Sequence, residues 1–358
     1  MTRANNAKFI AGLQAQRANT ADCRVFFIGD SNTVGLRAGA SSWANPRGLG
    51  YVTQLSDLLT SVTASATGFI GNGNSGNQTQ LRTMDGRLAF PTGSGWATTT
   101  NATYKIPGGI VISATSGANS EMVFTTPDAV DRCDIYHLTS GTIGWSVDGG
   151  SETAITGGTA GVINKSTLDL GSNAIHALKL RNLINAVFVV GLIFYSTMTK
   201  RVRLINAGAF NWLTDDWLDT ASGGWSPGSN YASFGQELTV IHLTINDSNA
   251  RADPATSMAN LLAMITALRA ANSDVWLICP QPISGAATQT VQNNYNAAIK
   301  ALGAAHGCTV IDLMHDYATY AAWSGASLAA DGLHPNFAGH TYVANRIRAA
   351  IDAIAAVA

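Results

Sequence analysis

The sequence has 358 residues, long enough for two ordinary domains or for one large domain with an insertion. Hydrophobic residues make up 46% of the chain and charged residues only 12%, so we expect a sizeable core and a surface wetted mainly by Ser, Thr, Asn and Gly. The formal net charge of -1 argues against a nucleic-acid groove and against capture by anionic lipid.

The first residues are polar and lack the apolar stretch of a signal peptide, which predicts a cytoplasmic protein or a virion or phage-associated one. No stretch reaches the roughly 18 uninterrupted apolar residues of a membrane helix. The longest strongly apolar run, from Val187 to Tyr195, has the length of a strand. The four cysteines have spacings of neither a zinc site nor a dense disulfide framework, so we expect buried thiols.

Strand and helix patterns alternate at both ends of the chain. The run "RVFFIG" at 24–29 predicts a buried strand, and 51–59 a helix. From residue 201 onward, "RVRLINAG", "ELTVIHLT", "DVWLICP" and "CTVIDL" are typical of strands buried on both faces. Helices are expected to begin at Asp253 and Pro254, and to cover 291–302 and 342–357. This alternation predicts a layered α/β fold with a parallel sheet.

Residues 64–199 have no helical period. Short segments such as "EMVFTT", "GWSVDGG" and "VFVVGLIFY", separated by turn residues, predict an antiparallel β-sandwich. The stretch "GWSVDGGSETAI" resembles the jelly-roll modules attached to carbohydrate-active esterases, which implies a sandwich of jelly-roll type. The sequence therefore divides into 1–63, an insertion at 64–199, and 200–358, with the first and last parts forming one domain. The insertion either engages a glycan or shapes the cleft, or it serves structure or oligomer contacts alone.

Two short motifs carry candidate chemistry. In "FFIGDSNTVG", Ser31 follows a buried strand, and in "DGLHP", Asp331 and His334 lie three residues apart. A serine hydroxyl needs an adjacent base, and that base needs an orienting group, which a histidine and an aspartate supply. The alternative is structural, since Ser and Asp after a strand are ordinary turn and helix-capping residues.

These motifs resemble the SGNH (GDSL-type) hydrolases. The first block is "GDSN" and the last is "DGLHP"; between them "INAGAF" fits the family's glycine block and "TIND" its Gly-x-Asn-Asp block. The resemblance covers roughly 22–62 and 200–350 and implies a three-layer α/β/α domain of flavodoxin-like type. Asn32 replaces the family's leucine, and Thr244 replaces the glycine of the third block.

The resemblance implies a role for each matching residue. Ser31 would be the nucleophile, His334 the general base and Asp331 its orienting carboxylate. The oxyanion hole would combine the N–H groups of Ser31 and Gly208 with the side-chain amide of Asn246. Gly50 or Gly73 could line the site in place of Gly208, and Asn246 could be a turn residue instead. No cofactor and no metal are implied.

The function expected from this pattern is that of a serine esterase, a carboxylic ester hydrolase. The favoured substrate is an acetylated glycan, which would make the protein an O-acetylesterase. One alternative is a lipase or thioesterase acting on longer acyl esters, although no long apolar lid is visible. The other is a non-catalytic glycan-binding or virion tail module. The sequence leaves the oligomeric state open.

Overall fold

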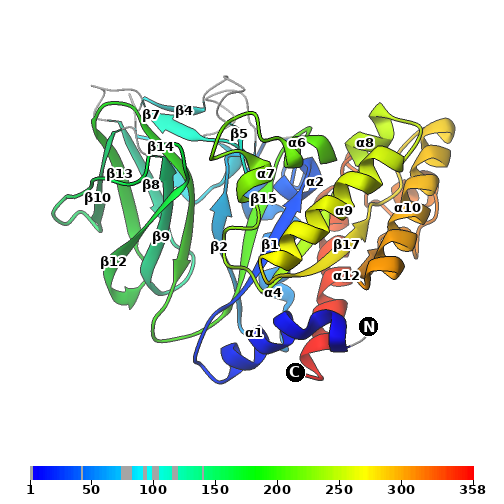
Figure 1. The fold of residues 1–358 in the computed structure, drawn as a ribbon, viewed down its shortest axis with the longest axis horizontal. Helices are drawn as coiled ribbons and strands as arrows, with labels where there is room; N and C mark the ends of the chain where they lie inside the picture. The colour runs from blue at the N-terminus through cyan, green and yellow to red at the C-terminus, as the bar shows by residue number, and fades with distance from the viewer. Residues whose placement is uncertain are drawn as a thin grey trace.

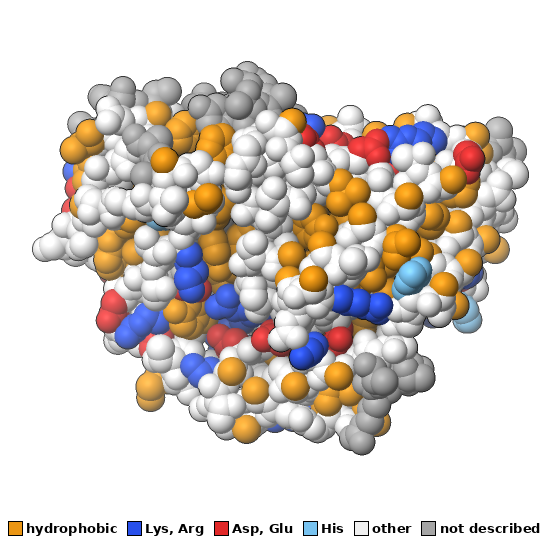
Figure 2. Space-filling model, viewed as in Figure 1, with side chains coloured by type: hydrophobic (Ala, Val, Ile, Leu, Met, Phe, Trp, Pro, Cys, Tyr) orange, Lys and Arg blue, Asp and Glu red, His pale blue; other side chains and the backbone are white. Residues whose placement is uncertain are grey.

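The computed structural model of the protein describes residues 3–41, 43–73, 83–91, 95–98, 105–114, 120–138 and 141–358. A helix-covered α/β part and a β-rich part stand side by side and share one continuous sheet (Figure 1). Charged side chains are sparse over the face drawn in Figure 2, where uncharged polar and hydrophobic groups cover most of the surface.

Six parallel strands form the centre of the α/β part. Their order across the sheet is β2 (Ala64–Ile70), β15 (Val202–Gly208), β1 (Cys23–Gly29), β16 (Leu238–His242), β17 (Asp274–Cys279) and β18 (Thr309–Asp312). Leaving β2 aside, the strands lie in the order second, first, third, fourth and fifth along the chain. This is the doubly wound, flavodoxin-like order, in which sites form at the carboxyl ends of the strands.

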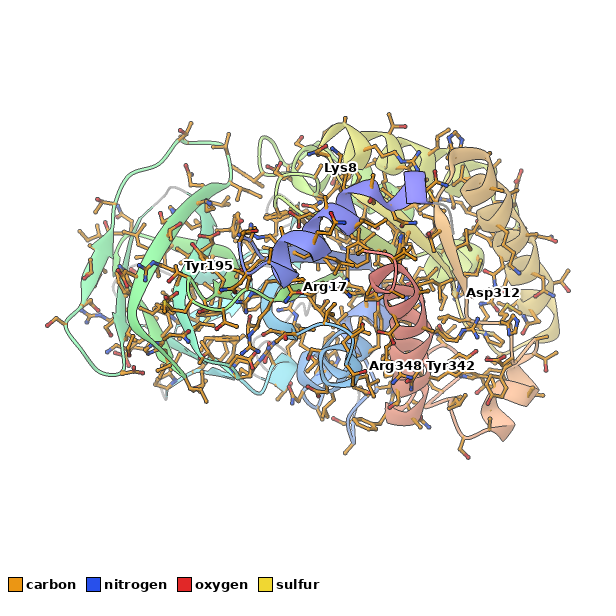
Figure 3. The ribbon with its side chains drawn as sticks, turned by 90° about the horizontal axis from the view of Figure 1, so that it is seen from below. Lys8, Arg17, Tyr195, Asp312, Tyr342 and Arg348 are labelled. Atoms are coloured by element: carbon orange, nitrogen blue, oxygen red, sulfur yellow. The ribbon has the colours of Figure 1, made fainter. Side chains whose placement is uncertain are left out.

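Helices cover both faces of this sheet because its strands are apolar on both sides. Val25 and Phe27 of β1 face one helical layer, and Phe26 and Ile28 face the other. The first layer holds α1 (Ala7–Arg17), α4 (Tyr51–Leu58) and α12 (Phe337–Ala355), with α1 and α12 side by side in Figure 3. The second holds α6 (Thr214–Leu218), α9 (Ala255–Ala270) and α10 (Ala286–His306).

The remaining helices are short. They are η1 (Arg3–Asn6), α2 (Ser31–Val34), α3 (Pro46–Leu49), α7 (Pro227–Asn230), α8 (Ile245–Ala250) and α11 (Tyr320–Gly325). Two of them, α2 and α8, directly follow strands β1 and β16 and so begin at the carboxyl edge of the sheet.

The β-rich part is a sandwich of antiparallel strands. One layer continues the central sheet through β14 (Val187–Tyr195), β9 (Val130–Leu138) and β12 (Asn164–Ala174), with β7 (Ile112–Ala114) and β4 (Trp96–Thr98) beside β14. The facing layer is β11 (Thr153–Ile155), β10 (Thr142–Val147), β13 (Ala177–Ile184), β8 (Glu121–Thr125) and β3 (Leu88–Ala89). A small pair joins β5 (Lys105–Ile106) to β6 (Gly109–Ile110).

The two layers enclose an apolar core of their own. Phe124 of the facing layer stacks on Phe194 of β14 with ring centroids 4.8 Å apart, and Phe69 of β2 joins the same cluster. Strand β2 therefore belongs to both parts, since it pairs in parallel with β15 and antiparallel with β14. The boundaries at 63/64 and 199/200 stay a prediction; we propose to keep them, with β2 as the strand that joins the insertion to the α/β domain.

The layers have the predicted fold class, whereas helix boundaries differ from the sequence-based expectation. Helix α9 begins at Ala255, with Pro254 rather than Asp253 at its N-cap, and α10 and α12 begin five residues before the predicted starts at 291 and 342. Helical spacing marks where a helix is buried, and Phe337, the first residue of α12, is exposed.

All four cysteines are buried and unpaired with each other, as expected. Within the described ranges, no helix is long and apolar enough to span a bilayer.

Candidate active site

Ser31 lies where the chain turns sharply from β1 into α2. Gly29 permits this turn, because a Cβ there would lie 1.8 Å from the Thr33 hydroxyl oxygen. Asp30 then caps α2, its Oδ1 accepting the Asn32 N–H at 2.9 Å. The capping interpretation and the nucleophile interpretation are therefore compatible, since the cap is Asp30 and Ser31 stands at the first helical position.

The structure brings Ser31, His334 and Asp331 together in one hydrogen-bonded chain. Ser31 Oγ lies 3.0 Å from His334 Nε2, and His334 Nδ1 lies 3.0 Å from each oxygen of Asp331. Because the carboxylate accepts the proton on Nδ1, Nε2 is left as an acceptor for the serine hydroxyl. This is the geometry in which a serine can be deprotonated.

Backbone groups hold the Asp331 carboxylate in place. Its Oδ1 accepts the N–H groups of Leu333 at 2.9 Å and of His334 at 2.8 Å. Burial alone would raise the pKa of Asp331, but these two N–H groups and the His334 ring hold that pKa below its ordinary value. The carboxylate therefore stays charged, which favours the protonated form of its histidine partner.

The strands on either side of β1 bring the other predicted residues to the same edge of the sheet. Gly29 pairs with Gly208 of β15 on one side and with His242 of β16 on the other, four residues before Asn246. Asn246 is partly buried and donates from Nδ2 to the Trp212 carbonyl at 3.0 Å. A carboxamide has two N–H groups, so a second one remains for a substrate oxygen.

The N–H group of Gly208 already has a hydrogen-bond partner within the chain. Its N–H donates to Asn206 Oδ1 at 2.9 Å, and Asn206 Nδ2 donates in turn to the Thr33 carbonyl at 2.7 Å. A Cβ at 208 would lie 2.3 Å from the Val34 nitrogen, so glycine is required here for α2 to pack against β15. The oxyanion role of Gly208 stays a prediction, and the hydrogen bond to Asn206 counts against it.

The two alternative glycines also use their N–H groups within the chain. Gly50 donates to the Pro46 carbonyl at 2.7 Å, and Gly73 donates to the Gly108 carbonyl at 3.0 Å. Neither is therefore better placed than Gly208 to offer a free donor.

Sequence reasoning missed Gln281, which connects the two halves of the site. Its side-chain amide donates to the Leu333 carbonyl at 3.0 Å and to Asn32 Oδ1 at 3.3 Å. Asn32, which stands where the family has leucine, thus ties α2 to the loop that carries His334. The available signal was a glutamine in "ICPQP", two residues beyond a buried strand at the carboxyl edge of the sheet.

Thr244 adopts the backbone of the glycine that it replaces. Its φ is 86°, a left-handed value that is costly for a β-branched residue. Its hydroxyl is buried without a hydrogen-bond partner among the described residues. Asn246 follows two residues later. The next residue, the buried Asp247, accepts hydrogen bonds from the backbone N–H and the hydroxyl of Thr214. This backbone strain is therefore stored directly beside the candidate oxyanion donor.

Asp30 makes the stability of the fold depend on pH. Burial raises the pKa of Asp30, and the negative charge of nearby Asp247 adds to this rise. The hydrogen bonds from Asn32 lower the pKa, but the net result is a pKa of about 7. The folded state therefore keeps a proton that the unfolded chain loses near pH 4, so the free energy of unfolding falls as pH rises from about 4 to 7. We expect the free energy of unfolding of Asp30→Asn to exceed that of the wild type at pH 8 by up to about 4 kcal/mol, with little difference at pH 4.

Urea unfolding at these two pH values measures the effect of Asp30→Asn. The carboxamide keeps the Oδ1 acceptor that caps α2 and removes the charge. If the free energy of unfolding of Asp30→Asn fell with pH as steeply as that of the wild type, a group other than Asp30 would cause the pH dependence.

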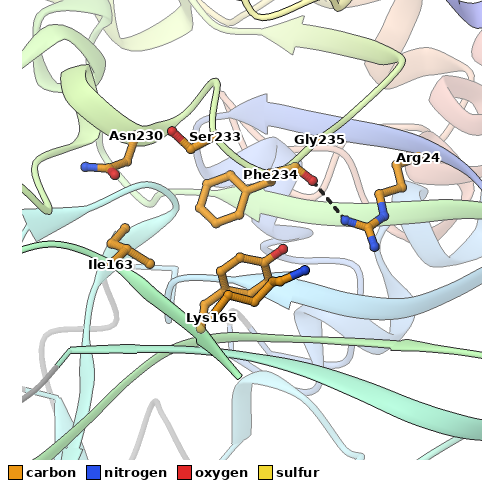
Figure 4. A pocket seen from close by; sticks show the side chains of 8 residues that line it. Arg24, Ile163, Lys165, Asn230, Ser233, Phe234 and Gly235 are labelled. Atoms are coloured by element: carbon orange, nitrogen blue, oxygen red, sulfur yellow. Dashed lines mark hydrogen bonds between the residues drawn. The ribbon is translucent and has the colours of Figure 1, made fainter. Parts of the chain in front are cut away.

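Two of the hollows on the described surface bear on the substrate. A shallow open depression of about 610 Å³ adjoins the loop of Asp331, and its lining is mostly apolar: Arg37, Ala38, Gly39, Ala40, Leu49, Asn336, Phe337 and Ala338. A second of about 290 Å³ lies between the sandwich and the α/β domain (Figure 4), lined by Arg24, Tyr136, Ile163, Lys165, Asn230, Ser233, Phe234 and Gly235. Arg24 lies at the amino end of β1, so this second hollow is remote from Ser31.

In the ranges that the structure describes, no group of three or more His, Cys, Asp or Glu side chains is arranged to hold a metal ion.

Comparisons with known proteins bear on the family and the fold of the chain. The model of the GDSL-like Lipase/Acylhydrolase family matches residues 196–342. No curated protein matches the chain at a significant level. A solved structure described as "Peptidoglycan O-acetylesterase in action" is 15% identical, with a TM-score of 0.71 over 98% of this chain and 97% of that one. This likeness confirms the predicted fold, an SGNH-type α/β/α domain with an inserted β-domain.

Two further structures resemble only part of the chain. An acetyl xylan esterase is 23% identical, with a TM-score of 0.37 over 43% of this chain and 83% of that one. A lipase/acylhydrolase from Enterococcus faecalis is 25% identical, with a TM-score of 0.36 over 43% of this chain and 77% of that one.

Proposed function

We propose that Ser31, His334 and Asp331 are the catalytic triad of this carboxylic ester hydrolase, whose residues 196–342 match the GDSL-like Lipase/Acylhydrolase family. The observation that carries this proposal is the unbroken series of hydrogen bonds from the Ser31 hydroxyl through the His334 ring to the Asp331 carboxylate. A site able to attack an ester also argues against the non-catalytic binding module.

The first half-reaction forms an acyl-enzyme. His334 Nε2 takes the hydroxyl proton while Ser31 Oγ bonds to the ester carbonyl carbon, giving a tetrahedral oxyanion. As the intermediate collapses, the bond from carbon to the alcohol oxygen breaks, and His334 returns its proton to that oxygen. The alcohol leaves, and the acyl group stays on Ser31.

Water completes the cycle by the same steps. His334 takes a proton from a water molecule while the water oxygen attacks the acyl carbon. As the second tetrahedral intermediate collapses, the bond from carbon to Ser31 Oγ breaks and His334 returns its proton to Oγ. This step releases the acid and restores the Ser31 hydroxyl. In both intermediates we assign the Ser31 N–H and the Asn246 amide as oxyanion donors. Gly208 joins them only if its N–H is released from Asn206.

We propose an O-acetyl ester on a glycan as the substrate. The depression beside Asp331 is shallow and open, with small side chains such as Ala38, Gly39 and Ala40 on one wall, which suits a small acyl group on a large polymer. The solved structure that shares both parts of the fold is described as a peptidoglycan O-acetylesterase, and we take over from it the substrate class alone. The second hollow, with Phe234 and Ile163 beside polar groups, has a lining suited to a sugar ring.

A longer acyl chain is the second candidate. Phe337 is 51% exposed at the rim of the depression, and the lining is mainly apolar, so a fatty acyl group could lie along it.

Two measurements separate these substrates. Acetate release is followed from a panel of acetylated polysaccharides, including O-acetylated peptidoglycan, and kcat/KM is compared for p-nitrophenyl esters from acetate to palmitate. We expect the highest kcat/KM at acetate, and release from at least one polymer. A maximum at long chains would overturn the acetyl assignment in favour of the lipase-like one, and no turnover of any ester would overturn the triad.

A further inference from the structure

Arg37 contacts the Asp331 carboxylate from the side opposite the backbone N–H groups. Its Nε lies 3.2 Å from Asp331 Oδ2, whereas Leu333 and His334 donate their backbone N–H groups to Oδ1. Oδ2 therefore has two neighbours among the described residues, the Arg37 guanidinium as an ion-pair partner and the His334 ring. Both side chains are partly exposed, so this pair alone contributes little to stability.

The backbone of Arg37 is strained. Its φ is 66°, in the left-handed region that costs a non-glycine residue roughly 1–2 kcal/mol. The neighbours hold it there: the Leu36 N–H donates to the Ser31 carbonyl at 3.0 Å, and the Ala38 N–H donates to the Gly35 carbonyl at 3.1 Å. The Leu36 carbonyl accepts from His340 Nε2 at 3.1 Å. This left-handed residue lies between two buried neighbours, while its own long side chain is exposed at the site.

We propose that Arg37 is a positioning residue, whose strained backbone places a guanidinium on Asp331 and so holds the carboxylate that orients His334. The inference rests on the proposed triad and adds a residue to it that the family motifs do not include. Unexplained strain beside a reacting group is the kind of feature that function, and not folding, retains.

A cation next to the carboxylate also changes the proton affinity of the histidine. Arg37→Gln removes a positive charge from the carboxylate that holds the His334 ring, so this variant tests the charge of Arg37 as well as its position. His340 lies on α12, and burial lowers its pKa to about 4. The His340 ring is therefore uncharged at neutral pH. Among the described residues, the charged or titratable groups that contact Asp331 or interact with His334 are Arg37, His340 and Tyr320 of α11.

Three substitutions separate the guanidinium from the backbone strain. Arg37→Gln removes the charge and keeps the strain, Arg37→Gly removes both, and Arg37→Lys keeps the charge. We expect kcat/KM to fall about tenfold in both Arg37→Gln and Arg37→Gly, since a small misplacement of a catalytic group has effects of this order. Arg37→Gly should melt about 2 °C above Arg37→Gln, because glycine relieves the left-handed backbone.

The pH profile gives a signature that a merely structural role would not produce. The acid limb of kcat/KM should move up by about 0.5 pH unit in Arg37→Gln and Arg37→Gly but not in Arg37→Lys. Arg348→Gln is the matched control: Arg348 is similarly exposed and faces Asp352 on α12, and its loss should change neither the rate nor the pH profile.

An NMR titration of the His334 ring separates this proposal from the proposed function, because it requires no turnover. A wild-type protein without esterase activity would overturn the triad, yet the midpoint of the His334 titration should still rise in Arg37→Gln. Wild-type rate, pH profile and His334 titration in Arg37→Gln would overturn the role of Arg37 while leaving the triad in place.

Discussion

Ser31→Ala should lower kcat/KM for p-nitrophenyl acetate by at least about 10⁴-fold, because the nucleophile of the acyl-enzyme is lost. His334→Ala should have a similar effect, since the hydroxyl 3.0 Å away then has no base. The two residues act in one step, so the double variant should be no slower than the slower single variant. Steady-state kinetics on the three purified proteins measures these losses.

A second histidine–aspartate pair supplies the control. His315 Nδ1 lies 2.7 Å from Asp316 Oδ1, but His315 is largely exposed and outside the site, so His315→Ala should keep the wild-type rate. Losses that multiply in the double variant would mean that Ser31 and His334 act independently, and the triad would have to be abandoned.

Asn246→Ala should lower kcat by about 10²–10³-fold with little change in KM, as expected for a donor that acts on the oxyanion and not on the bound ester. The partly buried amide already has one partner, the Trp212 carbonyl, which fixes its orientation before the substrate arrives. Asn246→Asp should lower kcat at least as much as Asn246→Ala, because a carboxylate can only accept hydrogen bonds and the oxyanion requires a donor.

Asn249→Ala is the matched control for this prediction, since it makes the same change on the exposed side of α8. Thermal melting of both variants shows whether the lost contact to Trp212 has loosened the loop. If Asn246→Ala raised KM and left kcat intact, Asn246 would bind the substrate and would not stabilise the oxyanion.

The sequence predicts the layered fold well because its main strands carry strong signals. Short runs rich in β-branched and apolar residues, such as 202–208 and 238–242, form strands buried on both faces, and the unbroken apolar run 187–195 forms a strand of the sandwich. Helix α1 was not predicted, since its apolar residues Phe9, Ile10 and Leu13 are spread thinly among polar ones. Such a helix is stabilised by what it packs against, here Trp276, 5.6 Å from Phe9 between ring centroids.

The candidate site was predictable where motif residues act through their own side chains. Ser31, His334 and Asp331 are each identified by residue type and spacing, and the structure sets them in hydrogen-bonding distance. Arg37 and Gln281 could not be identified from the sequence, because their contacts depend on how separate loops meet in space. The hydrogen bond from Gly208 to Asn206 likewise follows from the close approach of α2 to β15, which no local pattern encodes.

The position of β2 has a consequence for any attempt to reduce this protein to its hydrolase domain. Without residues 64–199, β15 would become the border of the sheet, and the N–H and C=O groups along its edge that pair with β2 in the intact fold would face water. A border strand with unpaired backbone groups is a template for intermolecular pairing and aggregation. We therefore expect a protein shortened in this way to associate with itself.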